Sequence, residues 1–133
     1  MILLIDTTRG LELRIGLANG RLRTRRRTYT HPAEAQLLAL IDELLRSTKA
    51  TSQDLSGIVV ATGPGPFSAL RSAVAVANAL GYVWQIPAVG VPGTRTMTQL
   101  HQRGSRKLRR AKIGQAVTPM YGKAANITTA AKR

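Results

Sequence analysis

Residues 58–71 of the chain read IVVATGPGPFSALR, and the elements that they predict are the best guide to its architecture. The apolar start, residues 58–61, is typical of a buried strand, and the two Gly-Pro pairs at 63–66 end that strand sharply. A helix is predicted over residues 66–81, because Pro is favoured in the first turn of a helix and Gly at its end. A strand, a tight turn and a helix in this order are typical of a layered α/β domain.

The turn at 63–66 lies where phosphate-binding loops lie, between a strand and the N-terminus of a helix. Two of its four residues are Pro, which lacks a backbone N–H, and no Lys follows in the Walker arrangement. We therefore interpret this turn as a rigid connector, with phosphate binding as the alternative.

Two further strands are predicted before this unit. Residues 1–5 form a short apolar run, and residues 11–17 alternate apolar and polar side chains as a half-buried strand does. Asn19-Gly20 predicts a two-residue hairpin turn, which would place Arg14 directly opposite Arg25. Solvent or a bound anion would relieve the repulsion between these like charges, and exposed charge also protects an edge strand from aggregation.

Two helices are predicted to carry more apolar surface than one sheet requires. The first spans residues 32–47, with Thr30 or His31 as its cap, and its apolar side chains cover an arc of about 160°. Those of the helix at 66–81 fill about half of its circumference, and Arg71 is its only charge. One contact surface needs only about 100°, so we expect a second polypeptide to cover part of both helices.

The chain becomes basic toward its end. Residues 88–91 predict a short strand, 94–102 a weak amphipathic helix, 103–112 a basic linker and 115–121 a final strand. The predicted organisation is one lobe at 1–102, followed by a basic linker, strand and tail at 103–133. The predicted fold class is α/β, with one mixed sheet and flanking helices.

Composition excludes several classes of function. The 133 residues are 44% hydrophobic and include no Cys, which excludes a disulfide scaffold, a Cys-based zinc site and a thiol nucleophile. No segment reaches about 18 unbroken apolar residues, and Asp6 interrupts the apolar N-terminus, so neither a membrane span nor a signal peptide is predicted. We expect a cytoplasmic protein without membrane contact.

Basic residues outnumber acidic ones by 20 to 6, and residues 101–133 contain nine basic residues and no acidic one. Such a charge attracts polyanions, and the alternative is a solubilising tail. The candidate RNA contacts are basic residues of the predicted hairpin and linker: Arg23, Arg25, Arg106, Lys107, Arg109 and Arg110.

Few side chains are placed for catalysis. Asp6 and the two Thr after it end the first strand, where several nucleotide enzymes hold Mg²⁺ or phosphate, and the alternative is a turn bonded to its own backbone. His31 and His101 lack a second ligand at metal-binding spacing, and the neighbours Asp42 and Glu43 point apart on their helix. We therefore predict no catalytic residue, no metal site and no cofactor.

Four segments together carry a family resemblance. They are MILLIDTT at 1–8, IDELL at 41–45, ATGPGPFSALR at 61–71 and IPAVGV at 86–91. They resemble the N-terminal lobe of the bacterial tRNA threonylcarbamoyladenosine biosynthesis protein TsaB family, most specifically at 63–71. TPMYGK at 118–123 resembles the closing strand of that family.

The resemblance implies a single lobe of the actin-like ATPase fold, which is related to ribonuclease H, without catalysis of its own. Members of the family pair with the catalytic subunit TsaD and act with the ATPase TsaE on an adenosine beside the tRNA anticodon. The family dimer is built from two helices of this lobe. The resemblance places the interface at Leu37, Ile41, Leu44, Phe67, Leu70, Arg71 and Val74.

The expected function is therefore a scaffold subunit that stabilises a TsaD-like partner, in a short form whose second lobe is mostly missing. On this reading Leu70→Asp abolishes partner binding and leaves the monomer folded. The alternatives are a small basic nucleic-acid-binding protein that acts alone and a nucleotide hydrolase that uses Asp6. A homodimer through the same helices is the alternative to the heterodimer.

Overall fold

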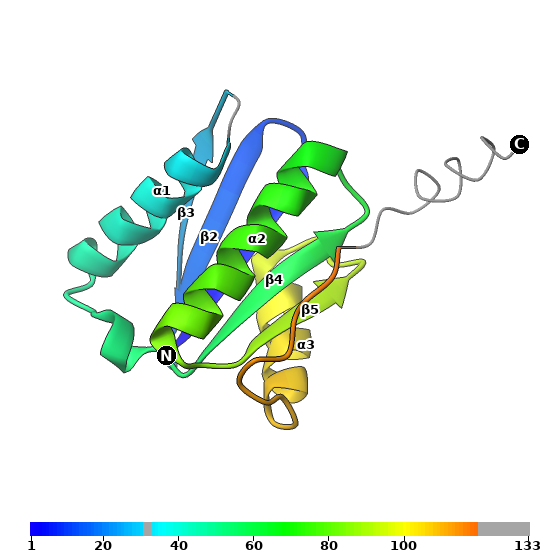
Figure 1. Cartoon of the computed structure of the whole chain (residues 1–133). Coiled ribbons are helices and arrows are strands. Elements are labelled where there is room, and N and C mark those ends of the chain that lie inside the picture. Colours follow the sequence, from blue (N-terminus) through cyan, green and yellow to red (C-terminus); the bar gives the residue numbers. More distant parts are fainter. Residues whose placement is uncertain (31–32, 120–133) are drawn as a thin grey trace, which may run out of the picture.

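The computed structural model describes residues 1–30 and 33–119, which form a five-stranded sheet with helices on both faces (Figure 1). The strands are β1 (Ile2–Arg9), β2 (Glu12–Ala18), β3 (Leu22–Thr28), β4 (Gly57–Gly63) and β5 (Ala88–Pro92). The helices are α1 (Ala33–Ser47), the short 3₁₀ helix η1 (Ser52–Asp54), α2 (Phe67–Trp84) and α3 (Met97–Leu108). The sheet order is β3-β2-β1-β4-β5, in which β1, β2 and β3 are antiparallel neighbours and β1, β4 and β5 are parallel. The predicted mixed sheet is confirmed.

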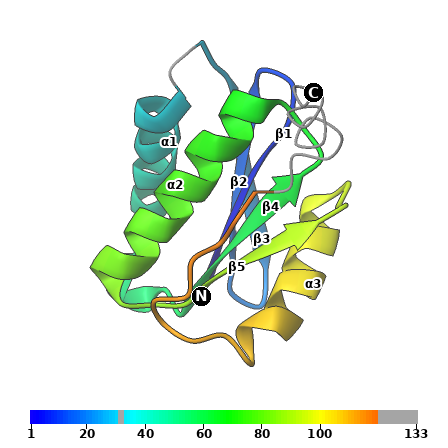
Figure 2. The same cartoon turned by 45° about the vertical axis from the view of Figure 1, so that its right-hand side comes forward.

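Helices α1 and α2 lie side by side on one face of the sheet, and α3 lies on the other (Figure 2). Leu3 and Ile5 of β1 belong to the apolar cluster under α1 and α2, whereas Leu4 belongs to the cluster under α3. Strand β4 alternates between the two clusters in the same way. Because both faces of the central strands are covered, their sequences are continuous apolar runs.

The predicted hairpin register is wrong by one residue. The loop between β2 and β3 has three residues, 19–21, and pairs Ala18 with Leu22, so that Arg14 faces Arg26 instead of Arg25. The physical reason is the position of Leu22, which packs against the apolar cluster under α3 in this register. A one-residue shift exchanges the two faces of a strand.

Two helix ends also differ from the prediction. Helix α2 passes through Gly81 to Trp84 and ends because Gln85 adopts a left-handed conformation with φ of 54°. Helix α3 begins at Met97, where the side chain of Thr96 accepts a hydrogen bond from the N–H of Gln99, and runs to Leu108. It therefore includes residues 103–108, which were predicted to begin a linker.

The segment after α3 reaches back to α2 without forming a strand up to residue 119. The side-chain amide of Asn78 accepts a hydrogen bond from the N–H of Val117 at 2.8 Å and donates one to its carbonyl at 3.0 Å. The remainder of the predicted final strand, the tail, and His31 and Pro32 lie outside the described residues. Among the helices that are described, none has the length and apolar character needed to cross a membrane.

Candidate functional site

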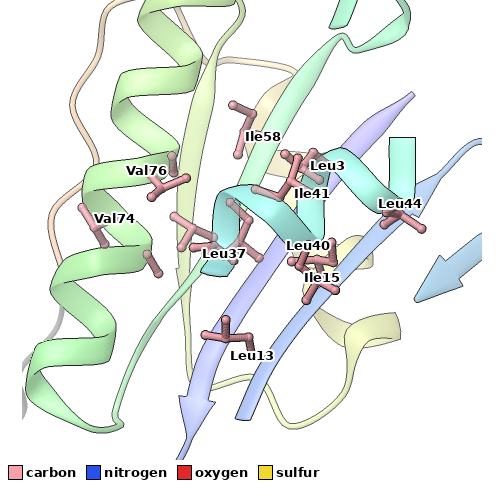
Figure 3. Close-up of a cluster of buried hydrophobic side chains, with 14 of the residues drawn as sticks. Leu3, Leu13, Ile15, Leu37, Leu40, Ile41, Leu44, Ile58, Val74 and Val76 are labelled. Atoms are coloured by element: carbon pink, nitrogen blue, oxygen red, sulfur yellow. The ribbon is translucent and has the colours of Figure 1, made fainter. Parts of the chain in front are cut away.

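Five residues of the predicted interface are buried by the chain itself. They lie in or beside the apolar cluster between α1, α2 and the sheet (Figure 3), and their side chains are 0–5% exposed. These residues are Leu37, Ile41, Leu44, Leu70 and Val74. The arcs on α1 and α2 are wide because each helix packs against both the sheet and the other helix. The expectation that these arcs leave apolar surface for a second polypeptide is therefore wrong for these five side chains.

The other two predicted interface residues lie on the outward side of α2. The ring of Phe67 is 49% exposed, and the guanidinium carbon of Arg71 lies 5.4 Å from its centroid, within the range of a cation–π contact. Apart from Ser68, the exposed side chains of α2 follow one another along the helix and are mostly apolar or small: Phe67, Arg71, Ala75, Ala79, Tyr82 and Val83. We call these six residues the α2 stripe.

Tyr82 and Val83 are the most exposed large apolar side chains of the stripe, at 73% and 68%. The sequence prediction missed them because it ended the helix at Gly81. For Tyr82 the signal was present in the helical periodicity, since at 100° per residue it lies on the side of α2 opposite to the buried Ala73 and Ala77. From Phe67 to Val83 the stripe is about 24 Å long at 1.5 Å per residue.

Asp6 lies at the end of β1 and is 2% exposed. Its Oδ1 accepts hydrogen bonds from the N–H and the hydroxyl of Thr8 at 2.8 and 2.6 Å, and its Oδ2 lies 3.8 Å from the guanidinium of Arg14. These contacts hold a turn, which favours the structural interpretation of Asp6 over metal or phosphate binding. Within the described ranges, no three His, Cys, Asp or Glu residues gather as a metal site requires.

The turn at 63–66 packs closely on the β1–β2 hairpin. A Cβ placed on Gly65 would lie 2.8 Å from the Cα of Thr8, and the hydroxyl of Thr7 donates a hydrogen bond to the carbonyl of Ala69 at 2.9 Å. Both contacts fix the start of α2 against β1. The interpretation of this turn as a rigid connector is therefore supported.

The structure separates the candidate RNA contacts into two groups. Arg23 and Arg25 lie on β3, one edge of the sheet, whereas Lys107 donates a hydrogen bond to the carbonyl of Gly90 on β5, the opposite edge. Arg106 is exposed on α3 beside Lys107, and Arg109 and Arg110 are exposed just after the helix. Four strand spacings separate the two edges, roughly 19 Å at 4.8 Å each, so these residues do not form one patch.

Arg27 and Glu43 join β3 to α1. The guanidinium of Arg27 donates two hydrogen bonds to the carboxylate of Glu43, at 2.7 and 3.0 Å. These bonds lower the pKa of the Glu43 carboxyl, and the positive charge of Arg25 acts in the same direction. Burial opposes them by raising this pKa.

We expect Glu43→Gln to lower the melting temperature at pH 7 by at most roughly 3 °C, because exposed ion pairs contribute little. Because the folded-state pKa of Glu43 is lowered, the ionised carboxylate contributes to stability above the unfolded-state pKa of about 4.3. This contribution is lost as pH falls through the folded-state pKa of Glu43. Thermal melts from pH 7 to pH 3 should show the difference between variant and parent disappearing.

Asp42→Asn is the matched control, because it removes the same charge from a more exposed ion pair. In that pair the side chains of Arg46 and Asp42 are 81% and 60% exposed. A smaller effect is expected there. Equal effects of the two variants at every pH would show that the paired geometry at Glu43 contributes nothing.

Comparison with known proteins places the chain in a family. Residues 30–106, more than half of the chain, match the family model of TsaD, tRNA N6-adenosine threonylcarbamoyltransferase. The tRNA threonylcarbamoyladenosine biosynthesis protein TsaB of Buchnera aphidicola subsp. Schizaphis graminum is 30% identical over 87 residues, which are 65% of this chain and 40% of the relative. The chain belongs to the family of TsaB and TsaD. The resemblance to TsaB is confirmed.

Two solved structures share the fold of this TsaB-like chain. YeaZ from Pseudomonas aeruginosa has a TM-score of 0.66 at 23% identity, over 79% of this chain and 49% of that chain. A protein described as similar to peptidase YEAZ from Pseudomonas aeruginosa has a TM-score of 0.64 at 24% identity, over 80% and 48%. The fold is a lobe of the actin-like, ribonuclease H-like class, as the resemblance implied.

This chain spans about half the length of the TsaB and YeaZ proteins that it matches, or less. The region that matches the TsaD family model, residues 30–106, begins just before α1, ends within the last turn of α3 and includes the whole α2 stripe.

Proposed function

We propose that the chain is a non-catalytic subunit in the biosynthesis of threonylcarbamoyladenosine in tRNA, and that it binds a TsaD-type catalytic partner through the α2 stripe. The name of the Buchnera relative supports the pathway. The exposed α2 stripe carries the proposal for the partner, because it is an apolar surface that residues 1–30 and 33–119 leave exposed.

The α2 stripe has the properties of a helix-to-helix interface. Ala75 and Ala79 have small side chains at its middle, which allow a partner helix to approach closely, and Phe67 and Tyr82 provide an aromatic ring toward each end. Exposed aromatic side chains of this kind are often the residues that contribute most to binding. Arg71 is the single charge and already contacts Phe67.

A non-catalytic role is supported by the turn at Asp6. The one acidic side chain at the end of β1 bonds to Thr8 and lies beside Arg14, so its oxygens are used within the fold. In this proposal the TsaD-type partner performs the chemistry, and a TsaE-like ATPase and tRNA complete the assembly in the cytoplasm. A second copy of the chain is the competing occupant of the stripe.

Phe67→Glu is expected to weaken binding of the TsaD-type protein from the same organism more than tenfold without changing the fold. A charged side chain in an apolar contact loses the packing of the ring and must be desolvated. Isothermal titration calorimetry of the purified proteins measures the affinity, and circular dichroism checks the fold.

Leu11→Glu is the matched control, because Leu11 is 55% exposed and lies at the β1–β2 turn, outside the α2 stripe. It should bind the partner as the parent does. Absence of binding by the parent, or equal weakening by both variants, would contradict the proposal. Light scattering of the parent alone identifies a homodimer, and its loss in Phe67→Glu would assign the stripe to a second copy instead.

A further inference from the structure

A groove of about 500 Å³ lies on the face of β2 and β3 that is turned away from α1. Helix α3 covers β1, β4 and β5 on this face, and only its first turn, at Met97 and Thr98, reaches the groove. The other lining residues come from β2 and β3: Arg14, Leu22, Thr24, Arg25 and Arg26. The groove is thus open sheet surface that the helix leaves uncovered.

The charge of the groove has one sign. Among the described residues, three arginines line it and no acidic side chain does. Arg14 has the carboxylate of Asp6 at 3.8 Å, but within residues 1–30 and 33–119 neither Arg25 nor Arg26 lies in an ion pair. The groove therefore has the charge to attract an anion.

The strand register adds a second reason to expect an anion. Arg14 and Arg26 are direct partners across β2 and β3, so their side chains leave the same face of the sheet about 5 Å apart. Like charges in this position repel each other. A bound anion between the two guanidinium groups would remove the repulsion.

We propose that this groove binds the phosphodiester backbone of a nucleic-acid strand. The basic surface extends beyond the groove, because five of the seven residues at 21–27 are Arg. Strand β3 is an edge of the sheet and its arginines leave both faces: Arg26 lies on the groove face with Leu22, whereas Arg23 and Arg25 pair with residues of the cluster under α1. Cations on both sides of one exposed edge fit an extended polyanion that runs along the strand better than a single phosphate.

The lining residues favour contacts to the backbone over contacts to the bases. Among the described residues that line the groove, none is aromatic and none is Asn, Gln, Asp or Glu, so the groove offers no aromatic ring for stacking and no amide or carboxylate for base edges. The Thr hydroxyls and guanidinium groups are typical phosphate contacts. We therefore expect binding with little sequence preference that weakens as salt rises.

The test uses the chain alone, so its outcome does not depend on the proposed TsaD-type partner. The probes are fluorescein-labelled 20-mers, oligo(U) and oligo(dT), titrated by anisotropy from 50 to 200 mM salt. The variant Arg25→Gln/Arg26→Gln is expected to bind at least fivefold more weakly than the parent. The slope of log affinity against log salt should fall by about 1.4, or about 0.7 for each lost phosphate contact.

The matched control is Arg106→Gln/Arg109→Gln, which removes the same charge from exposed residues distant from β3. It should weaken binding less than twofold. Equal loss in both double variants, no binding by the parent, or displacement of the probe by an equal charge concentration of polyglutamate would overturn the proposal. Equal binding of the two oligomers identifies the phosphodiester as the ligand, and tighter binding of oligo(U) assigns the groove to RNA.

Discussion

Leu70→Asp is expected to unfold the chain. Leu70 is 0% exposed on α2, and its replacement removes a buried apolar side chain and places a carboxylate in the core. Loss of packing costs about 2–5 kcal/mol, and burial of an unpaired charge adds several more. The sum is comparable with the total stability of a small domain, about 5–15 kcal/mol. Circular dichroism should show loss of the cooperative thermal transition.

Two control variants separate burial from charge. Leu38→Asp introduces the same charge on α1 at a side chain that is 44% exposed, and it should remain folded. Leu70→Met keeps the volume and should lose less than about 1.5 kcal/mol in a urea titration. A folded Leu70→Asp protein that melts within a few degrees of the parent would mean that Leu70 lies on the surface.

The sequence prediction expected the opposite result for Leu70→Asp. It treated an apolar arc wider than one contact surface as exposed surface, which is correct for a helix with a single neighbour. Here α1 and α2 pack on the same face of the sheet and on each other, so each has two neighbours. Periodicity gives the width of an apolar arc and contains no information about how many elements cover it.

The central strands were predictable because their burial on both faces leaves a simple pattern. The apolar residues of β1 and β4 are consecutive in the sequence, and the Gly-Pro pairs mark the end of β4. The hairpin was less predictable, because Asn19-Gly20 favours a two-residue turn and the structure adds Arg21 to the loop. Burial of Leu22 decides between the two registers, and that burial depends on α3, which is distant in sequence.

The candidate site was predictable in part for the same reason. Phe67 and Arg71 were found at the start of α2, whose position the Gly-Pro turn determines. Tyr82 and Val83 were missed because Gly81 resembles a helix end, and the structure ends the helix at Gln85 instead. The groove was not predictable, because Arg14 and Arg26 meet only in the observed register.

Gly104→Ala is expected to destabilise the chain although Ala favours helix formation by about 1 kcal/mol relative to Gly. A Cβ on Gly104 would lie 2.3 and 2.5 Å from the two γ-methyl carbons of Val59, which is 0% exposed on β4. The backbone of β4 cannot move easily, since this strand lies between β1 and β5. We expect a net loss of about 1–3 kcal/mol in urea denaturation, as overpacked cores show.

Val59→Ala tests the cause of this loss, because it removes both γ-methyl groups and leaves the Cβ of residue 59, which would be 2.9 Å from the new atom. The double variant Val59→Ala/Gly104→Ala should be more stable than the sum of the two single losses by about 1 kcal/mol or more. Additive losses would show that α3 does not touch β4 at Gly104. Because Met97 and Thr98 at the start of the same helix line the groove, Gly104→Ala should also weaken oligo(U) binding, and Val59→Ala should partly restore it.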